Sequence, residues 1–357
     1  MTQRYTRRLQ ITSLVASYCY IAFSYAQSPL EQVDREQGNS LNLRSNLPIA
    51  SAYGAQTLTA FELSANDSND EDIITEADPA NEESILSKKV EAEDSLQSNP
   101  RGILSHNPNY FLPISYFSGS NDQTSSPSLG TVDVDPDFRD TEAKFQFSFK
   151  ATIWDIVPEY KSKLFFGFTA TSWWQVYARE ASSPFREVNY EPELFWEFPF
   201  RLKPTNVEFV TAQLGISHQS NGQDIPFSRS WNRIYASFAW EAGDIIYQFK
   251  PWYRIPESEK MSPDQTQGDD NPDIEDYLGH FEFRATLKNH RNEISLGLRN
   301  NFQRNENRGA VSIDWILPGG KQSKPYIQIM HGYGDSLIDY NDLITRVSLG
   351  ILLSGWY

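Results

Sequence analysis

The sequence has 357 residues and a net charge of −16, so it lacks the positive charge with which a general nucleic-acid binder meets phosphates. Aromatic residues are abundant, with 22 Phe, 18 Tyr and 9 Trp, whereas only 3 Met and 1 Cys occur. The length suits one large domain or two ordinary ones.

The first 26 residues have the three parts of a secretory signal peptide. A basic start, MTQRYTRRLQ, precedes a short apolar segment, ITSLVASYCYIAF, and Ser24 and Ala26 then occupy the positions preferred before a cleavage site. The single cysteine, Cys19, lies inside this segment, so we expect the mature chain to have no thiol, disulfide or Cys-type metal site. A membrane anchor is the alternative interpretation, which the shortness of the apolar segment disfavours.

Residues 27–104 form an acidic, low-complexity extension. Between Glu62 and Pro100, twelve acidic residues face only two lysines, and aromatic residues are almost absent. Such a segment cannot bury enough apolar surface to offset the entropy that is lost on ordering it. We therefore predict that this extension is disordered.

Residues 105–357 alternate between apolar and polar side chains with a period of two. The pattern predicts twelve strands, at 109–117, 143–153, 162–178, 190–200, 206–218, 230–241, 244–256, 277–288, 291–301, 308–317, 324–333 and 343–356. Long connections alternate with short ones, as in an all-β, twelve-stranded antiparallel transmembrane β-barrel of a bacterial outer membrane. A soluble β-sandwich is the alternative, and strands of ten or more residues disfavour it.

The segment GISHQSNGQDIPFSRSWNR, residues 215–233, carries a polar cluster on an apolar strand face. Because alternate residues share a face, His218, Ser220 and Asn232 all lie on the apolar side of their strands, which meets lipid in such a barrel. An antiparallel pair centred on residue 225 places 218 opposite 232 and 220 opposite 230. These are the side-chain types of a base, a nucleophile and an orienting group. The alternative is that they are rim residues that bind lipid headgroups.

With these residues in view, the chain resembles the outer-membrane phospholipase A family from about His106 to Tyr357. The resemblance lies in SWWQ (172–175), SSPFREVNYEPELF (182–195), HQSNG (218–222), SRSWNR (228–233), KPWY (250–253), DDNPDIEDYLG (269–279) and GYGDSLIDYN (332–341). It implies a membrane-embedded barrel that hydrolyses acyl esters of phospholipids and lysophospholipids, of phospholipase A1 and A2 type. It also implies dependence on Ca2+, activity as a homodimer, and a catalytic rim that faces the cell exterior.

The resemblance assigns roles to the polar cluster. It implies that Ser220 is the nucleophile, that His218 is the general base and acid, and that Asn232 orients His218. The backbone N–H of Gly222 would bind the oxyanion, together with water polarised by calcium.

The resemblance also implies the calcium ligands. They are the carbonyl of Gln223, the hydroxyl of Ser228 and the carbonyl of Ser182 from the partner subunit, with waters completing the shell. A ligand donated by the partner would couple calcium binding to dimer formation. Without the resemblance, the SSPF and NPDI segments would be interpreted as ordinary turns.

Three positions depart from the family. The resemblance points to a weak second calcium site at Asp270, but Ile225 replaces an aspartate that helps to form it in some members. Ala170 stands where a buried glutamine can bridge the two subunits, and Gln223 stands where a basic residue is usual. Two alternative functions therefore stay open, namely a passive outer-membrane barrel (a small porin or structural protein) and an inactive family member.

Overall fold

The structure is a computed structural model of the chain. It describes residues 84–97, 102–119, 123–199, 208–288, 292–320 and 322–356, all within the unit Glu82–Tyr357. The expected signal peptide and most of the expected disordered extension lie outside these residues. In the described part of the chain, no helix is long and apolar enough to cross a membrane.

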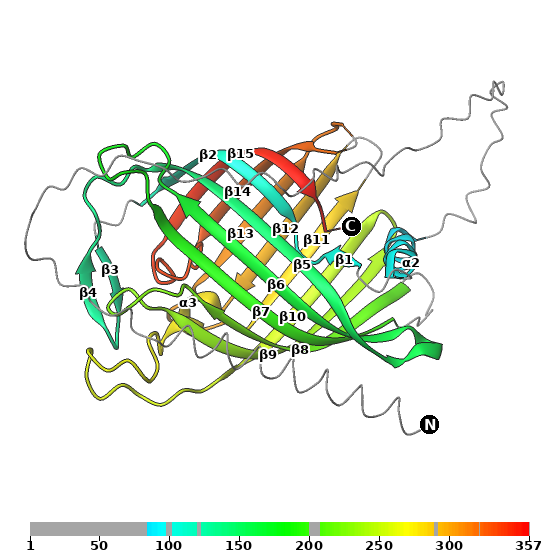
Figure 1. The fold of residues 1–357 in the computed structure, drawn as a ribbon, viewed down its shortest axis with the longest axis horizontal. Coiled ribbons are helices and arrows are strands. Elements are labelled where there is room, and N and C mark those ends of the chain that lie inside the picture. Colours follow the sequence, from blue (N-terminus) through cyan, green and yellow to red (C-terminus); the bar gives the residue numbers. More distant parts are fainter. Residues whose placement is uncertain are drawn as a thin grey trace, which may run out of the picture. The chain divides into compact units, whose positions relative to one another are not determined.

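Antiparallel strands close into a barrel in which each strand pairs with the next barrel strand along the chain (Figure 1). The strands are β2 (Asn109–Ser118), β5 (Thr141–Val157), β6 (Ser162–Trp174), β7 (Phe185–Pro199), β8 (Glu208–Ser220), β9 (Ser230–Ala242), β10 (Ile245–Ile255), β11 (Phe281–Lys288), β12 (Glu293–Asn300), β13 (Gly309–Ile316), β14 (Lys324–Gly332) and β15 (Ile344–Ser354). Pairing of β15 with β2 closes the barrel. The predicted twelve-stranded antiparallel barrel is therefore confirmed.

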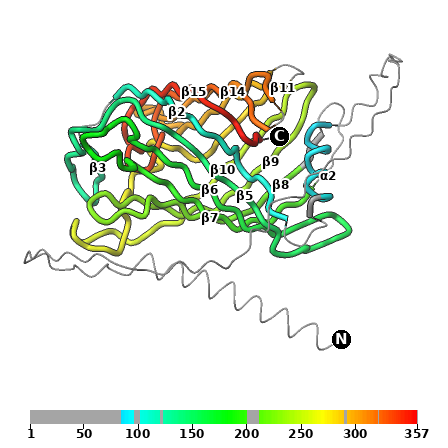
Figure 2. The backbone as a smooth tube through the Cα atoms, turned by 45° about the horizontal axis from the view of Figure 1, so that its top comes forward, coloured from blue at the N-terminus to red at the C-terminus, as the bar shows by residue number. Residues whose placement is uncertain are grey.

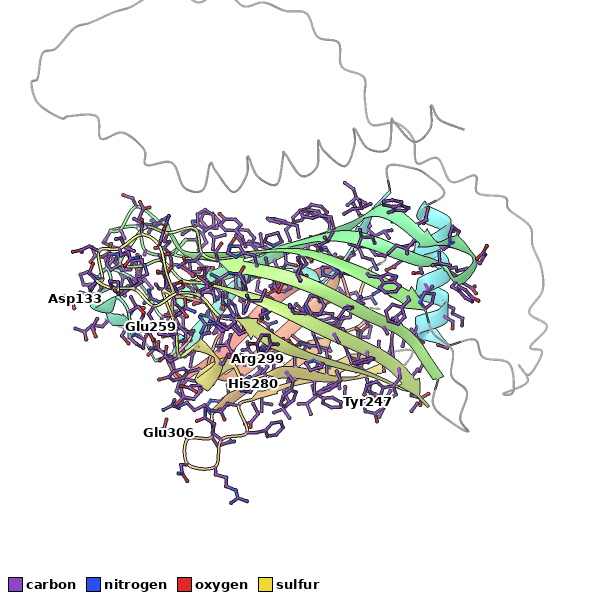
Figure 3. All side chains as sticks on the ribbon, turned by 90° about the horizontal axis from the view of Figure 1, so that it is seen from below. Asp133, Tyr247, Glu259, His280, Arg299 and Glu306 are labelled. Atoms are coloured by element: carbon purple, nitrogen blue, oxygen red, sulfur yellow. The ribbon has the colours of Figure 1, made fainter. Side chains whose placement is uncertain are left out.

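The two ends of the barrel differ. Long connections such as 175–184, 221–229 and 256–280 lie at one end, here called the long-loop end, together with the hairpin of β3 (Gln123–Ser126) and β4 (Gly130–Asp133) and the helix α3 (Ile274–Leu278) (Figures 1 and 2). The labelled side chains of Asp133 and Glu259 mark this end in Figure 3. Tight turns such as 243–244 lie at the opposite, short-turn end, where α2 (Ile85–Gln97) is also found (Figure 1).

The barrel has an apolar outer surface and a polar interior. Outward positions expose large apolar side chains, among them Leu214, Ile216, Leu296, Ile313, Val347 and Leu349. Inward positions bury polar side chains, among them Thr286, Ser295, Asp314, Arg346 and Ser348. This distribution is the reverse of that in a soluble protein and is the one that a lipid-embedded barrel requires.

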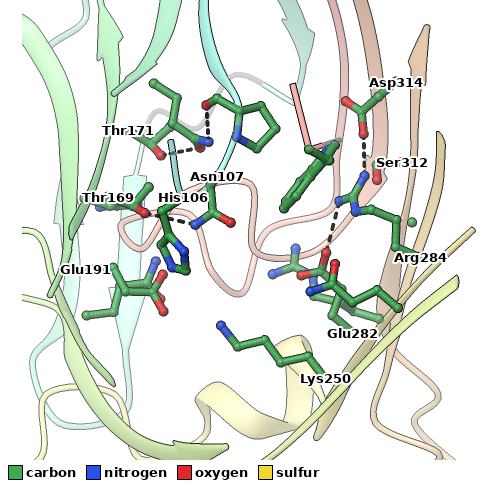
Figure 4. Close-up of a pocket in the computed structure, with 18 of the residues that line it drawn as sticks. His106, Asn107, Thr169, Thr171, Glu191, Lys250, Glu282, Arg284, Ser312 and Asp314 are labelled. Atoms are coloured by element: carbon green, nitrogen blue, oxygen red, sulfur yellow. Dashed lines mark hydrogen bonds and ion pairs between the residues drawn. The ribbon is translucent and has the colours of Figure 1, made fainter. Parts of the chain in front are cut away.

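Charged side chains cross the lumen in ion pairs. They include Lys250 with Glu193 at 3.1 Å, Lys144 with Asp335 at 3.2 Å and Arg284 with Asp314 at 2.7 Å. Side chains from several strands, among them Lys250, Glu282 and Arg284, point into the same space (Figure 4). The cavity left between them has a volume of about 370 Å³, room for a limited number of waters.

The prediction of disorder up to residue 104 is wrong at its C-terminal end. Residues 85–97 form α2, and Ile103–Ser105 form β1, which pairs with β5. Leu86 of α2 packs against Ala239 and Ile246 of the barrel. Ion pairs also join the helix to the barrel, Asp94 to Lys163 at 2.7 Å and Glu93 to Lys150 at 2.8 Å. These contacts with the barrel, which the local composition does not reveal, offset the entropy of ordering the segment.

Four strand boundaries differ from the prediction by four or five residues. Strand β5 continues to Val157 rather than ending at residue 153. Strand β6 ends at Trp174 rather than at residue 178 and β7 begins at Phe185 rather than at residue 190, so the connection between them is shifted to 175–184. Strand β11 begins at Phe281 rather than at residue 277, because residues 274–278 form α3. Gly279 ends that helix with φ of +73°, a conformation that favours glycine, and a Cβ there would meet the carbonyl oxygen of Asn300 at 2.1 Å.

Candidate active site at the rim of strands β8 and β9

The polar cluster lies where β8 ends and β9 begins, at the long-loop end of the barrel. The two strands pair with His218 opposite Asn232 and Ser220 opposite Ser230, so the register predicted from the sequence is confirmed. Leu214, Ile216 and Ile234, on the same outward face, are exposed, whereas the inward neighbours Ser217 and Arg233 are buried. The three predicted site residues therefore share the outward face, and each of them is half-buried.

One hydrogen bond fixes the relation between two of them. Nδ1 of His218 lies 2.8 Å from Oδ1 of Asn232, across the gap between the strands. With the amide oxygen as acceptor, the imidazole carries its proton on Nδ1 and keeps a lone pair on Nε2. Ser220 follows two residues along the same face. The arrangement therefore has the elements of an activated serine.

Asn221 shapes the loop that follows the serine. Its Oδ1 accepts hydrogen bonds from the backbone N–H groups of Gln223, at 3.3 Å, and Arg229, at 2.9 Å, and its Nδ2 donates to the carbonyl of Phe227 at 2.9 Å. The side chain is buried. Sequence reasoning missed this residue, although Asn-Gly is a turn signal that could have pointed to it.

Gly222 has φ of +64°, in the left-handed region that glycine adopts without strain. A Cβ added there would meet the Tyr190 ring at 3.4 Å, which is an ordinary contact. Space is therefore not the constraint at this position, and the backbone conformation is. That conformation determines the direction of the Gly222 N–H, the predicted oxyanion donor.

Gly222→Ala is expected to lower ester hydrolysis at least tenfold, because alanine in this conformation costs about 1–2 kcal/mol and the segment relaxes away from it. Initial rates of fatty-acid release measure the effect. Gly243→Ala is the matched control, since Gly243 has φ of +59° in the tight turn between β9 and β10, with no atom within 4 Å of the added Cβ. Equal losses of activity in the two variants would contradict a specific role for Gly222.

Two of the predicted calcium ligands lie in the same loop. Ser228 Oγ donates a hydrogen bond to Oδ2 of Asp270 at 2.7 Å, which leaves the hydroxyl lone pairs available to a cation. Gln223 contributes a backbone carbonyl from the same loop. No cluster of three or more His, Cys, Asp or Glu that could hold a metal ion occurs among the described residues. Hydroxyl and carbonyl oxygens are donors that calcium accepts, so the donor set fits this ion.

Ser182, the third predicted ligand, lies in the loop between β6 and β7. Both Ser182 and Ser183 have positive φ, of +64° and +50°, a conformation that is costly for residues other than glycine. The turn is held by N–H groups of both serines and by Trp174 Nε1, which donates to the carbonyl of Ser183 at 2.9 Å. Ser182 itself is exposed. Consecutive strained residues of this kind are typical of functional loops.

Asp270, the predicted second calcium position, has a cation from the protein itself. Lys260 Nζ lies 2.6 Å from Oδ1 of Asp270, and both side chains are buried. The other oxygen accepts from Ser228. A calcium ion at this carboxylate would therefore compete with a lysine ammonium.

Glu257 also contacts the site, and sequence reasoning missed it. Its Oε1 accepts a hydrogen bond from Nδ2 of Asn232 at 2.9 Å. The residue lies just beyond β10, in the connection 256–280, which no motif or periodicity marked as part of the site.

Aromatic side chains cover the outer surface of β5, β6 and β7, next to the site. Phe147 and Tyr190 are exposed, and Ala170 pairs with both in the two strand registers. Ring contacts link Phe149 to Phe168 at 5.8 Å and Phe168 to Tyr190 at 6.5 Å. Tyr190 in turn pairs with Ser220 across β7 and β8, so this aromatic surface adjoins the cluster.

The chain resembles one known protein family and members of it over most of its length. Residues 86–353 match the family described as Phospholipase A1. The phospholipase A1 of Salmonella typhimurium is 32% identical over 276 residues, which cover 77% of this chain and 88% of that protein. A putative phospholipase A1 of Neisseria meningitidis serogroup B is 35% identical over 259 residues, which cover 71% of this chain and 65% of that protein.

Solved structures of bacterial outer membrane phospholipases resemble this chain in fold and in sequence. The outer membrane phospholipase A of Escherichia coli, an active-site mutant with an asparagine replaced by alanine, matches with a TM-score of 0.64 and 30% identity over 76% of this chain and 98% of that chain. The outer membrane phospholipase of Salmonella typhi, a dimer with bound calcium, matches with a TM-score of 0.65 and 33% identity over 74% of this chain and 97% of that chain. This chain belongs to the phospholipase A1 family.

Proposed function

We propose that this protein hydrolyses acyl ester bonds of phospholipids and lysophospholipids on the outward face of the barrel. Ser220 is the nucleophile, His218 the general base and acid, and Asn232 orients His218. The observation that carries the proposal is the 2.8 Å contact between His218 and Asn232 on a surface that otherwise exposes apolar side chains. An unsatisfied polar group on such a surface costs about 1–3 kcal/mol, so a cluster there calls for a function.

The residues act in sequence. His218 Nε2 accepts the proton of Ser220 Oγ as that oxygen bonds to the ester carbonyl carbon, and Asn232 Oδ1 holds the imidazolium through Nδ1–H. His218 then gives the proton to the departing alkoxide as the ester C–O bond breaks. Water, deprotonated by His218, next attacks the acyl enzyme and releases the fatty acid and Ser220. Throughout, the N–H of Gly222 donates to the developing oxyanion.

Calcium fits beside these residues. The hydroxyl of Ser228, the carbonyl of Gln223 and the carbonyl of the partner subunit's Ser182 would hold it, with waters completing a shell of oxygens. When bound, the ion adds positive charge and a polarised water near the oxyanion. The relative from Salmonella typhi, a dimer with bound calcium, supports this assignment.

The surface below the site favours a lipid substrate. Leu214, Ile216 and Ile234 are exposed on the outward face of β8 and β9. They lie farther from the long-loop end than Ser220 does. An acyl chain lying along this face brings its ester to the rim. A substrate of this kind needs no pocket in the lumen, because the acyl chain remains in the membrane.

A homodimer is the active form in this proposal, because Ser182 acts from the partner. The aromatic surface of β5 to β7 adjoins the site and offers a large apolar contact area, and Ala170 leaves a small side chain between Phe147 and Tyr190. These side chains already face lipid rather than water in the monomer, so the hydrophobic effect does not drive association. Close packing of the side chains has to do so. The dimer of the Salmonella relative supports the arrangement.

The barrel lies in the bacterial outer membrane with its long-loop end toward the cell exterior. Barrels of this class have short turns on the periplasmic side and long loops outside, and the long loops here carry the proposed site. The passive-barrel alternative is less well supported, because ion pairs cross the lumen and leave only about 370 Å³ between them.

Removal of calcium is expected to abolish hydrolysis reversibly. Fatty-acid release from mixed micelles, followed with excess chelator and after calcium is restored, measures this. Ser228→Ala is expected to raise the calcium concentration for half-maximal activity at least about tenfold, because one oxygen ligand is lost. Ser262→Ala, an exposed serine in the connection 256–280, is the control and is expected to have no effect. Full activity in chelator would contradict the calcium assignment.

A further inference from the structure

The end of β10 explains how Glu257 reaches the site. Ile255, the last residue of β10, pairs with Asn232 of β9. It lies on the outward face with Tyr253, whereas Arg254 between them points inward and is buried. Two residues farther along the chain, Glu257 returns to the outward side and places Oε1 at 2.9 Å from Nδ2 of Asn232. The β9–β10 register, whose last pair is Ile255 with Asn232, thus brings the start of the connection 256–280 next to Asn232.

A carboxylate at this position determines which way the amide of Asn232 points. The two ends of an asparagine amide have nearly the same size, so the side chain alone could present either its oxygen or its NH2 group to an imidazole. An ionised carboxylate can only accept hydrogen bonds, so the NH2 group has to face Glu257. The amide oxygen then faces His218 and accepts from Nδ1–H, at 2.8 Å. Nε2 is left with the lone pair that a general base needs.

The cationic side chains near Glu257 are paired with other carboxylates, so the Glu257 carboxylate remains hydrogen-bonded to the amide of Asn232. Asp269 is held by Arg254, whose guanidinium donates to both carboxylate oxygens at 2.7 and 2.8 Å. Asp270 is held by Lys260 at 2.6 Å. No lysine or arginine of the described residues pairs with Glu257. Partial burial and the nearby Asp269 raise the pKa of Glu257, and its hydrogen bond from Asn232 and the charge of Arg254 oppose the rise.

We propose that Glu257 is a positioning residue of the active site, whose carboxylate fixes the amide of Asn232 and, through it, the tautomer of His218. Its negative charge also polarises the amide and stabilises the imidazolium. A neutral asparagine alone stabilises an imidazolium less than an aspartate would, and the charge of Glu257 adds to this stabilisation. This inference rests on the proposed function. The relay then has four members, Ser220, His218, Asn232 and Glu257.

The test compares Glu257→Gln with Glu259→Gln in the full-length protein in detergent micelles with saturating calcium. Glutamine keeps the size of the side chain but loses its charge and its fixed acceptor character. Glu257→Gln is expected to lower kcat about tenfold with little change in KM, and to move the acid limb of the pH–rate profile to lower pH. Glu259 is exposed in the same connection, so Glu259→Gln is expected to leave both unchanged.

A second variant guards against loss of folding as the explanation. In the background of Asn232→Asp, residue 232 is a carboxylate that Glu257 repels, whereas a glutamine at 257 can donate to it. Glu257→Gln is therefore expected to raise activity in that background, the opposite of its effect on the natural sequence. An effect of the same sign in both backgrounds would overturn the proposal.

Two further outcomes separate this inference from the proposed function. If Ser220→Ala is inactive while Glu257→Gln keeps the natural kcat and pH profile, the positioning role is wrong and the proposed function stands. If Ser220→Ala is fully active, the proposed function fails and the role of Glu257 fails with it. A lower kcat with an unmoved pH profile would reduce Glu257 to a structural contact and would also overturn the inference.

Discussion

Ser220→Ala is expected to lower the rate of ester hydrolysis by at least about 10⁴-fold, because removal of the nucleophile leaves only binding and oxyanion stabilisation. The loss should appear in kcat, since Ser220 forms its bond only as the reaction proceeds. The change removes one oxygen from a half-buried residue at the end of β8, so the barrel should fold normally. Fatty-acid release by the purified variant, with calcium present, measures the effect.

The matched control is Ser230→Ala. Ser230 is the cross-strand neighbour of Ser220 in the β8–β9 pair and is likewise half-buried. The same oxygen is removed one strand away, so the loss of a polar group at the rim is common to both variants. Full activity of Ser230→Ala with an inactive Ser220→Ala supports the assignment, whereas comparable rates in the two variants would refute it.

Glu142→Ala is expected to lower the free energy of unfolding by about 3–5 kcal/mol, the largest effect on stability that we predict. The Glu142 carboxylate is fully buried and accepts from two arginines, Arg346 at 2.9 Å and Arg186 at 3.0 Å. Its removal takes one carboxylate partner from each buried guanidinium group. Arg346 then keeps Asp335 and Arg186 keeps Asp339. Equilibrium unfolding in urea measures the change. The folded fraction is read from gel electrophoresis, in which the folded barrel and the unfolded chain migrate differently.

An exposed ion pair gives the comparison. Glu180 pairs with Arg139 at 3.0 Å, and more than half of each side chain is exposed. Screening by water makes such pairs weak, so Glu180→Ala is expected to leave the unfolding midpoint unchanged. If Glu142→Ala is no more harmful than Glu180→Ala, the lumen network does not stabilise the barrel as we infer.

The barrel and the register of its site were predictable because both depend on local alternation. A period of two assigns each side chain to lipid or lumen. Because His218 and Asn232 are close in sequence, a turn centred on residue 225 sets the antiparallel register that pairs them. The structure confirms that register through the pairs His218–Asn232 and Ser220–Ser230. Strand ends were less accurate, as at Phe185 and Phe281, because loops and the short helix α3 decide them.

Other features depend on contacts between segments that are distant in sequence. The composition around α2 predicts disorder, and the helix is ordered by partners such as Lys163 and Ala239, far along the chain. Glu257 carries no motif, and its contact with Asn232 follows from where β10 ends. Lys260 and Asp270 likewise meet only when the connection 256–280 folds back on itself. Neither periodicity nor spacing contains this information.

The most direct test of the lipid-facing serine esterase is covalent labelling by a long-chain alkyl sulfonyl fluoride in detergent micelles with calcium. An activated serine attacks the sulfur and expels fluoride, and peptide mass spectrometry locates the adduct. We predict one adduct, on Ser220, that requires calcium and is absent from His218→Ala. A folded barrel that stays unlabelled at Ser220, or is labelled equally at other serines, would contradict the account.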